Sequence, residues 1–315
     1  MTVVSEGDLM WTPDAARIAR SNVTRYMNWL EANRGLSFGS YDELWRWSTT
    51  ETETFWASIW DYIDVQSDCA YTAVTDSLEM KPGNRWYIGS RVNFAEHVLR
   101  ALDPAAPALQ YLSELRPLAS LSGRELASRV RVLGTRLRAM GVAPGDRVCA
   151  LMPNVPETVV AMLAAISIGA VWANAAPEFG QQPILDRFAQ VEPKVLFVVD
   201  GYRYGGKDHD RREMVGEIVG KLGSVRQVVY LRNLFPTAPA PSANWHYYED
   251  LLTGEDPGPA NFRFERLACD DPLWVVFSSG TTGLPSAARS GHCQGQLPGG
   301  FGSLPAGTDL CPLAA

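Results

Sequence analysis

The chain has 315 residues, of which 46% are hydrophobic and 20% are charged, a composition typical of a soluble globular protein with one large or two ordinary domains. Its net charge of −7 argues against a nucleic-acid partner, which would require a basic surface. The five cysteines form no Cys-x-x-Cys pair, so their spacing predicts neither a zinc site nor a disulfide framework.

No segment of the sequence has the features of a membrane-targeting signal. The N-terminus contains Glu6 and Asp8 and lacks the apolar stretch of a signal peptide. The uncharged run over 159–176 approaches the length of a membrane span, but polar residues interrupt it and acidic residues flank it. We interpret this run as a buried helix followed by a buried strand. Widely spaced cysteines fit a reducing compartment, and we therefore expect a cytoplasmic protein without a membrane partner.

Residues 1–120 are rich in aromatic side chains and carry most of the ten tryptophans. Apolar residues recur at helical spacing over 18–30 and over 50–63. This pattern predicts a mainly helical region that caps a larger domain, and we expect its tryptophans to pack in a core rather than to form a ligand cage.

From residue 121 the pattern changes to alternating helices and short apolar strands. Ser122 can cap the first helix and Gly141 can end it. Strands separated by helices indicate βαβ units and a mostly parallel sheet, hence an α/β fold over 121–285. The expected helices are 122–141, 156–168, 184–191 and 211–222, and the expected strands are 147–152, 171–173, 195–199, 228–231 and 273–277.

The segment 275–285 reads Val-Val-Phe-Ser-Ser-Gly-Thr-Thr-Gly-Leu-Pro and is the most informative in the chain. An apolar strand ends there in a loop of hydroxyl groups and glycines, at the strand end where ligands bind in open α/β sheets. Backbone N–H and side-chain O–H groups of such a loop can donate to a phosphate, although the chain has no Walker A motif. The residues expected to bind phosphate are Ser278, Ser279, Gly280, Thr281, Thr282 and Gly283.

This loop resembles the phosphate-binding loop of the acyl-adenylate-forming enzymes, the AMP-dependent synthetase and ligase superfamily. Other segments between residues 10 and 285 resemble the same family in order, most of all its acetoacetyl-CoA synthetase branch. The resemblance implies the N-terminal part of the large α/β domain of this family, with parallel sheets and packed helices. The segments include Met-Trp-Thr-Pro at 10–13, Asn-Phe-Ala-Glu at 93–96, Gly-Asp-Arg-Val at 145–148, Ile-Gly-Ala-Val-Trp at 168–172, Leu-Asp-Arg-Phe at 185–188 and Asp-Gly-Tyr-Arg-Tyr at 200–204.

The resemblance also implies a two-step reaction that uses ATP, CoA and Mg²⁺. A carboxylate substrate attacks the α-phosphate of ATP to give acyl-AMP and pyrophosphate, and the CoA thiol then attacks the acyl carbonyl and releases AMP. The hydroxyl and glycine loop would hold the β- and γ-phosphates of ATP, while no Mg²⁺ ligand can be assigned in this chain. For the acetoacetyl branch the substrate would be acetoacetate; acetate and propionate are the alternatives.

A second loop contains two cations separated by glycines, which can bind a phosphate. By similarity to the acetyl-CoA synthetases, Arg203, Gly205, Gly206 and Lys207 would contact the 3′-phosphate ADP part of CoA. The alternative is a solvated charged loop, which the following Asp208 favours.

The chain departs from the family pattern at Ser286, where the family has a lysine, because serine cannot supply a positive charge near the leaving pyrophosphate. Beyond it, residues 286–315 are mainly Gly, Ala, Pro, Leu and Ser without helical or strand periodicity. We predict an aberrant or disordered tail, translated in a wrong reading frame, with a flexible linker as the alternative.

Since the chains of the family are much longer, we expect this chain to hold no complete catalytic set and to be inactive alone. It would then be an incomplete ligase, a non-catalytic CoA-binding fragment or a non-functional one. In the last case, loss of neighbours would leave the 273–277 strand exposed and prone to aggregation.

Overall fold

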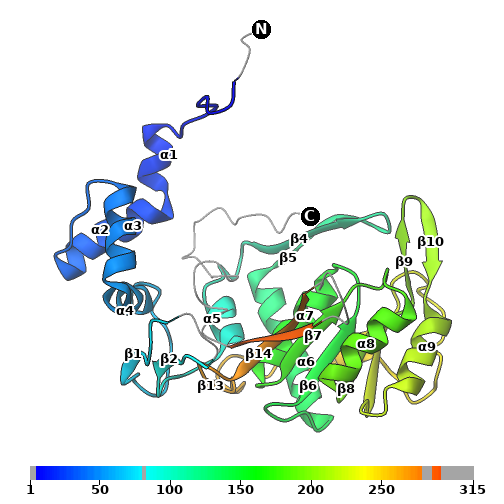
Figure 1. The fold of residues 1–315 in the computed structure, drawn as a ribbon. Helices are drawn as coiled ribbons and strands as arrows, with labels where there is room; N and C mark the ends of the chain where they lie inside the picture. The colour runs from blue at the N-terminus through cyan, green and yellow to red at the C-terminus, as the bar shows by residue number, and fades with distance from the viewer. Residues whose placement is uncertain (1–4, 80–82, 279–285, 292–315) are drawn as a thin grey trace. The chain divides into compact units, whose positions relative to one another are not determined.

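The computed structural model describes residues 5–79, 83–278 and 286–291. The contacts divide the chain into two compact units, of which the first ends at Val65 and the second begins at Gln66 (Figure 1). This division falls earlier in the chain than the boundary that we expected near residue 120. The two units are described separately below.

The first unit is helical. Ser21 divides the apolar pattern over 18–30 between two helices, because its backbone is extended and its side chain accepts a hydrogen bond from the Thr24 N–H at 3.1 Å. The second of these helices ends at Gly35, whose φ of 64° lies in the left-handed region. The helices are α1 (Ala15–Arg20), α2 (Asn22–Arg34), α3 (Tyr41–Thr50) and α4 (Thr52–Tyr62).

Aromatic residues form much of the core of the first unit. Leu30 is completely buried and packs with Tyr26, Leu44 and Ile59. The expected core packing of tryptophans is confirmed for three of them and is wrong for two. Trp29, Trp47 and Trp56 pack against this core, whereas Trp11 and Trp45 are 63% and 56% exposed.

The start of the second unit contains strands that the sequence did not predict. The expectation of a mainly helical region up to residue 120 is wrong from residue 73 onward. The largest of these strand pairs is the antiparallel hairpin β4–β5, whose turn contains Glu114. The elements are β1 (Ala73–Thr75), β2 (Trp86–Ile88), β3 (Arg91–Val92), α5 (Phe94–Arg100), β4 (Pro107–Ser113) and β5 (Arg116–Ser122).

A seven-stranded sheet forms the centre of the second unit, as far as the chain is described. The strand order is β12-β11-β8-β6-β7-β14-β15, and every neighbouring pair is parallel except β14–β15. The expected α/β fold is therefore confirmed. The strands are β6 (Arg147–Leu151), β7 (Val171–Ala175), β8 (Val195–Val199), β11 (Gln227–Leu231), β12 (His246–Tyr247), β14 (Pro272–Ser278) and β15 (Ser286–Gly291).

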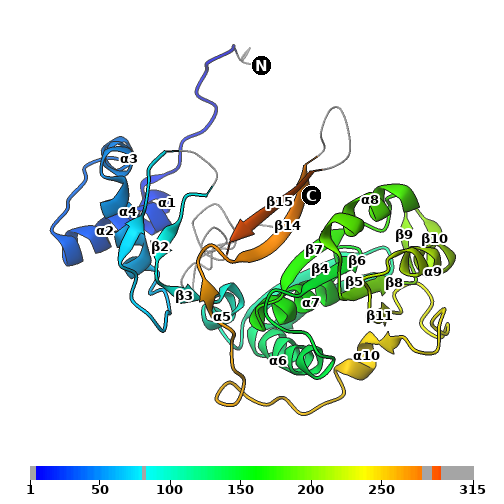
Figure 2. The ribbon, with the colours of Figure 1, turned by 60° about the horizontal axis from the view of Figure 1, so that its bottom comes forward.

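Helices cover both faces of this sheet (Figure 2). In β8, Val195, Phe197 and Val199 face one hydrophobic core, and Leu196 and Val198 face the other, as the period of two in a strand requires. The first core receives side chains from α5 and from α6 (Gly123–Ala139), α7 (Pro156–Ser167) and α10 (Tyr248–Leu251); the second receives them from α8 (Gln181–Val191) and α9 (Arg212–Lys221).

Local signals explain where the predicted helices begin and end. Ser122 and Glu125 form a reciprocal capping box at the start of α6, and Gly141, with a φ of 85°, follows its end. Pro156 occupies the first turn of α7, and Gly169, with a φ of 80°, follows it. Among the described residues, no helix is both long and apolar enough to cross a membrane.

The strand β14 has neighbours on both sides. It pairs in parallel with β7 and antiparallel with β15, so the exposed 273–277 strand that we associated with a non-functional fragment is not found. The strand β15 was not predicted, because its sequence Ser-Ala-Ala-Arg-Ser-Gly has neither apolar alternation nor β-branched residues. The expected disordered tail thus begins no earlier than residue 292, and residues 292–315 lie outside the described part of the chain.

Candidate functional site

The two loops singled out in the sequence follow strands of the same sheet. Because β6, β7, β8, β11 and β14 are parallel neighbours in one order, their carboxyl ends lie at one edge. Ser278 ends β14 at this edge. The other expected phosphate ligands, 279–283, lie outside the described residues.

The second loop leaves the same edge after β8. Gly201 begins a strand directly beyond Asp200, and the two strands β9 (Gly201–Tyr204) and β10 (Lys207–Asp210) form an antiparallel hairpin. Since β6 and β7 separate β8 from β14, the carboxyl ends of β8 and β14 lie roughly 14 Å apart at about 4.8 Å per strand. The sheet therefore brings the two loops to one side of the molecule, where ligands bind in open α/β folds.

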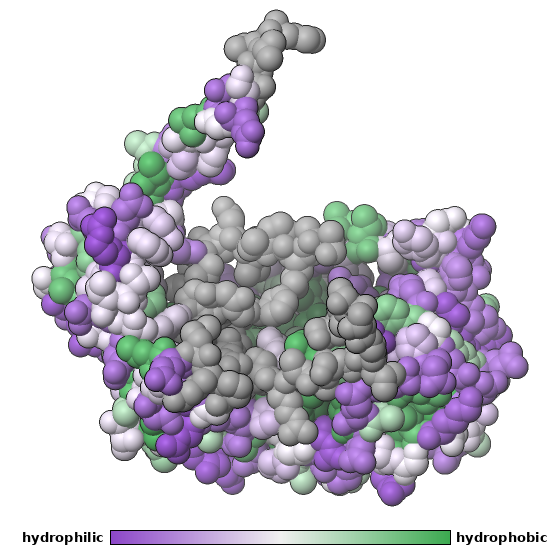
Figure 3. Space-filling view, viewed as in Figure 1, coloured by the Kyte–Doolittle hydropathy of each residue, from purple (hydrophilic) through white to green (hydrophobic). Residues whose placement is uncertain are grey.

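The CoA loop expected from the sequence is the tip of the β9–β10 hairpin. Tyr204 pairs with Lys207 across a two-residue turn of Gly205 and Gly206, with φ values of 59° and 73°. Positive φ at both positions is the geometry of tight hairpin turns, and glycine adopts it without strain. Figure 3 shows mainly hydrophilic residues over this part of the surface.

Several of the donor groups that we expected to bind phosphate already form hydrogen bonds with carboxylates of the same chain. The backbone N–H groups of Gly205 and Gly206 each donate to an oxygen of the Glu114 carboxylate at 2.7 Å. The Arg203 guanidinium donates to both oxygens of Asp208 at 2.6 and 3.1 Å, and these bonds lower the pKa of the Asp208 carboxyl. Lys207, in contrast, has no ion-pair partner among the described residues.

Stacked side chains hold the base of this hairpin. The Tyr202 and His209 rings stack at 4.8 Å between centroids, and the Arg211 guanidinium lies 5.3 Å from the centre of the Tyr202 ring and donates to the Tyr202 hydroxyl. The loop is thus an ordered hairpin with an acid at its tip. Sequence reasoning missed Glu114, because no local signal connects residues so far apart in the chain.

Two further candidate features of the site are a metal centre and an aromatic lining of an acyl pocket. Within the described ranges, no group of three or more His, Cys, Asp or Glu side chains is arranged to hold a metal ion. Trp172, the last residue of the family-like segment 168–172, is 4% exposed and its ring lies 6.2 Å from that of Phe197, so it is part of the core.

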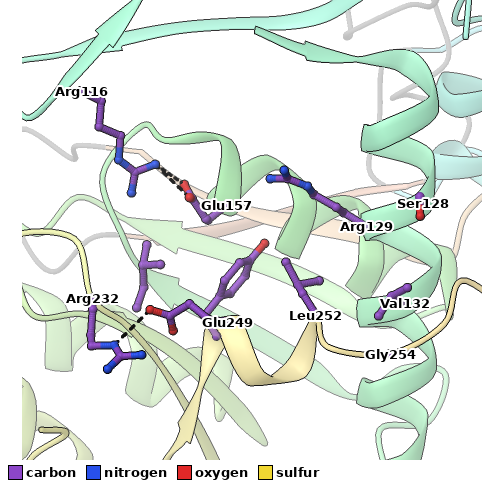
Figure 4. A pocket seen from close by; sticks show the side chains of 11 residues that line it. Arg116, Ser128, Arg129, Val132, Glu157, Arg232, Glu249, Leu252 and Gly254 are labelled. Atoms are coloured by element: carbon purple, nitrogen blue, oxygen red, sulfur yellow. Dashed lines mark hydrogen bonds and ion pairs between the residues drawn. The ribbon is translucent and has the colours of Figure 1, made fainter. Parts of the chain in front are cut away.

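The sequence also missed a pocket of about 510 Å³ between α6, α7, the end of β11 and α10. Figure 4 shows Arg116 paired with Glu157 and Arg232 paired with Glu249 at its wall. Arg203, Gly205, Gly206 and Lys207, which we expected to bind CoA, do not line it.

Comparison with known proteins identifies the family. Residues 97–292 match the family model described as AMP-binding enzyme. The chain belongs to the AMP-binding enzyme family. Residues 41–98 match the model described as the N-terminus of acetyl-coenzyme A synthetase. The first match ends at residue 292, close to position 286, from which we expected the tail of this AMP-binding chain to depart from the family.

The relatives include acetoacetyl-CoA synthetases. The chain is 37% identical over 277 residues to acetoacetyl-coenzyme A synthetase of Rhizobium meliloti (strain 1021), covering 88% of this chain and 42% of the relative. It is 34% identical over 290 residues to the acetoacetyl-CoA synthetase of Macaca fascicularis, covering 90% and 43%. The solved acetoacetyl-CoA synthetase from Streptomyces lividans matches with a TM-score of 0.84 and 43% identity, covering 91% and 43%. The AMP-binding chain therefore spans less than half the length of these relatives.

Proposed function

We propose that this chain forms part of an acetoacetate–CoA ligase. The observation that carries the proposal is its similarity, over about nine-tenths of its length, to the acetoacetyl-CoA synthetase from Streptomyces lividans in both fold and sequence. The relatives from Rhizobium meliloti and Macaca fascicularis are also acetoacetyl-CoA synthetases. Because the chain spans only 42–43% of their lengths, the activity is proposed for a polypeptide of their full length.

The proposed reaction proceeds in two steps. One oxygen of the acetoacetate carboxylate attacks the α-phosphorus of ATP, and the bond to the β-phosphate oxygen breaks to release pyrophosphate. The CoA sulfur then attacks the acyl carbonyl carbon, the bond to the AMP oxygen breaks, and the thiol proton is lost to solvent. Catalysis of the first step depends on positioning and on stabilisation of negative charge.

Two sets of residues have proposed roles in this reaction. The hydroxyl and glycine loop after β14 would hold the β- and γ-phosphates of ATP, with Ser278, Ser279, Thr281 and Thr282 as hydroxyl donors and Gly280 and Gly283 allowing close backbone approach. Arg203, Gly205, Gly206 and Lys207 would bind the 3′-phosphate ADP part of CoA. The common sheet edge supports this assignment, because both loops leave it.

Among the described residues, no group of three or more His, Cys, Asp or Glu side chains could hold a metal ion. Mg²⁺ often binds through substrate phosphates with few protein ligands. We therefore assign no Mg²⁺ ligand and derive no step through the ion.

The experiment that tests the proposal compares two polypeptides. The 315-residue chain, with serine at position 286, is expected to form no acetoacetyl-CoA from ATP, acetoacetate and CoA. A hybrid that joins residues 1–278 to the remaining residues of the Streptomyces lividans relative is expected to form it. An inactive but folded hybrid that binds ATP would contradict the proposal, and activity of the 315-residue chain would contradict the expected incompleteness.

A second candidate substrate is acetate or propionate. The observation that favours it is the match of residues 41–98 to the acetyl-coenzyme A synthetase model. AMP release measured for the hybrid with acetoacetate, acetate and propionate separates the two candidates through the ratio of kcat/KM values.

A third possibility is a CoA-binding chain without catalysis, which equilibrium binding of CoA to the 315-residue chain in the absence of ATP would reveal. Sequencing of the gene across codons 280–320 tests the prediction that residues 286–315 are translated in a wrong reading frame. If the prediction is correct, another reading frame encodes lysine near position 286.

A further inference from the structure

The pocket between α6, α7 and α10 is lined by a guanidinium that forms neither a hydrogen bond nor an ion pair with any described residue. Arg116 donates to both oxygens of Glu157 at 2.8 and 2.9 Å, and Arg232 donates to Glu249 at 3.1 Å. The guanidinium of Arg129 has no hydrogen-bond or ion-pair partner within the described part of the chain. Figure 4 shows this side chain extending from α6 into the space beside Glu157.

The same pocket contains an unpaired hydrogen-bond donor. Tyr248 lines it and is 3% exposed, and its hydroxyl is buried without any hydrogen-bond partner. Burial raises the pKa of the Tyr248 hydroxyl, so the group remains a neutral donor at physiological pH. A buried donor without a partner is unfavourable, and a ligand that accepts from it would remove this cost.

The charges of the residues that line the pocket determine which kind of ligand it can bind. Three guanidinium groups (Arg116, Arg129 and Arg232) face two carboxylates (Glu157 and Glu249), which leaves one net positive charge. A single carboxylate neutralises that charge and matches the planar fork of a guanidinium. A phosphate dianion would leave an excess negative charge beside the two glutamates.

The size and the remaining wall of the pocket fit a short organic acid. Its volume of about 510 Å³ is within the range of small-molecule sites. Val132, Leu231 and Leu252 supply apolar surface to the same wall, which can receive a hydrocarbon chain. An inorganic anion would leave this surface unused.

We propose that this pocket binds a small monocarboxylate, whose carboxylate pairs with Arg129 and accepts a hydrogen bond from Tyr248. The site is separate from the residues assigned to CoA, because none of Arg203, Gly205, Gly206 and Lys207 lines the pocket. The inference therefore stands whether or not the proposed ligase activity is correct. The monocarboxylate bound in this pocket is a ligand in addition to the carboxylate substrate of the proposed ligase, and it does not take part in the proposed reaction.

The test measures binding of hexanoate and of hexanamide to the 315-residue chain by isothermal titration calorimetry. Hexanoate is expected to bind saturably and hexanamide, its uncharged analogue, at least about tenfold more weakly, because the amide lacks the charge that pairs with Arg129. Equal binding of the two, or no saturable binding of hexanoate, would overturn the proposal. Competition by inorganic phosphate at lower concentration than hexanoate would also overturn the carboxylate assignment.

Three variants locate the site. Arg129→Gln is expected to weaken hexanoate binding about tenfold, the effect of losing one charge-assisted contact. Tyr248→Phe should weaken it several-fold while leaving the fold intact, because it deletes only an unpaired hydroxyl. Arg124→Gln, on the exposed face of α6 outside the pocket, is the matched control and should bind as the unmodified chain. Unchanged binding by folded Arg129→Gln would refute the assignment.

Discussion

Glu114 and Gly205, which lie 91 positions apart in the sequence, are joined by a 2.7 Å hydrogen bond from the glycine N–H to the carboxylate. A second bond of the same length connects the Gly206 N–H to the other oxygen of that carboxylate. Successive backbone N–H groups in a tight turn bind anions, and here an acid of the same chain fills this position. A phosphate of CoA can use these donors only if Glu114 moves away.

We therefore predict that Glu114→Ala increases the affinity of the 315-residue chain for 3′,5′-ADP. An exposed charge-assisted bond is worth roughly 1 kcal/mol, so the increase should be about threefold to tenfold. Calorimetric titration measures it. Glu213→Ala removes an exposed acid that follows the same hairpin and makes no contact with its turn, and it controls for the general effect of charge. Equal affinities of the two variants would show that Glu114 does not compete with the ligand.

The free ammonium group of Lys207 gives a second prediction for the same hairpin. If Lys207 contacts the 3′-phosphate of CoA, Lys207→Ala should weaken CoA binding about tenfold, equivalent to about 1.4 kcal/mol. The loss should disappear with dephospho-CoA, which lacks that phosphate. Lys221→Ala, an exposed lysine of α9, is the control. A loss of the same size with both ligands would indicate a role for Lys207 other than 3′-phosphate binding.

Periodicity predicted the central part of the fold because each element there has a strong local pattern. Alternate residues of β8 enter two different cores, so the whole strand is apolar, and α6 has both a capping residue and a glycine at its end. The hairpins β4–β5 and β9–β10 have no such pattern. Most side chains of β10 are charged and exposed, and the strand forms because the Gly205–Gly206 turn directs the chain back on itself.

The candidate site was only partly predictable for a related reason. The residues that could bind phosphate are recognisable as types, since glycines and cations occur together at 203–207. Which of their donors are already occupied depends on Glu114, whose position is set by the β4–β5 hairpin. The charge balance of the pocket between α6, α7 and α10 likewise depends on five separate segments, namely β5, α6, α7, the residue after β11 and α10, so no local pattern reveals it.

Asn93, part of the Asn-Phe-Ala-Glu segment that suggested the family, holds three parts of the second unit together. Its carboxamide oxygen accepts from the Glu96 N–H at 3.1 Å and caps α5, while its amide donates to the carbonyls of Ile166 and Glu265 at 2.9 and 2.7 Å. The side chain is completely buried. Asn93→Ala removes these three bonds from the buried interior, and we expect it to lower the free energy of unfolding by about 2–4 kcal/mol.

Urea denaturation followed by tryptophan fluorescence measures this loss. The control is Asn261→Ala, which removes an exposed asparagine with one side-chain bond to the Pro257 carbonyl and should cost less than about 1 kcal/mol. Equal effects of the two substitutions would show that the Asn93 bonds do not stabilise the fold.

We expect His97 to make the stability of the second unit dependent on pH. Its ring is 5% exposed, with Nε2 accepting from the Gln66 N–H at 2.7 Å and Nδ1 placed 2.9 Å from the Asn93 carbonyl oxygen. Nε2 can accept only while it is unprotonated. Burial lowers the pKa of His97 below 6.5, opposed by the Asn93 carbonyl and the nearby Glu96 charge and assisted by the charges of Arg100 and Arg266.

The sign of the effect follows from the direction of this shift. Between the lowered folded-state pKa and the unfolded value near 6.5, the unfolded chain binds more protons than the folded one. The stabilising contribution is therefore complete above pH 6.5 and decreases as the pH falls through that window. We predict that the free energy of unfolding, measured with urea, decreases from pH 7 to pH 5. For the variant His97→Asn, the free energy of unfolding should decrease less over the same range. The control is His246→Gln, which replaces a histidine that is hydrogen-bonded to Gln227. Its free energy of unfolding should depend on pH as that of the unmodified chain does. Parallel pH profiles for His97→Asn and the unmodified chain would exclude His97 as the source of the dependence.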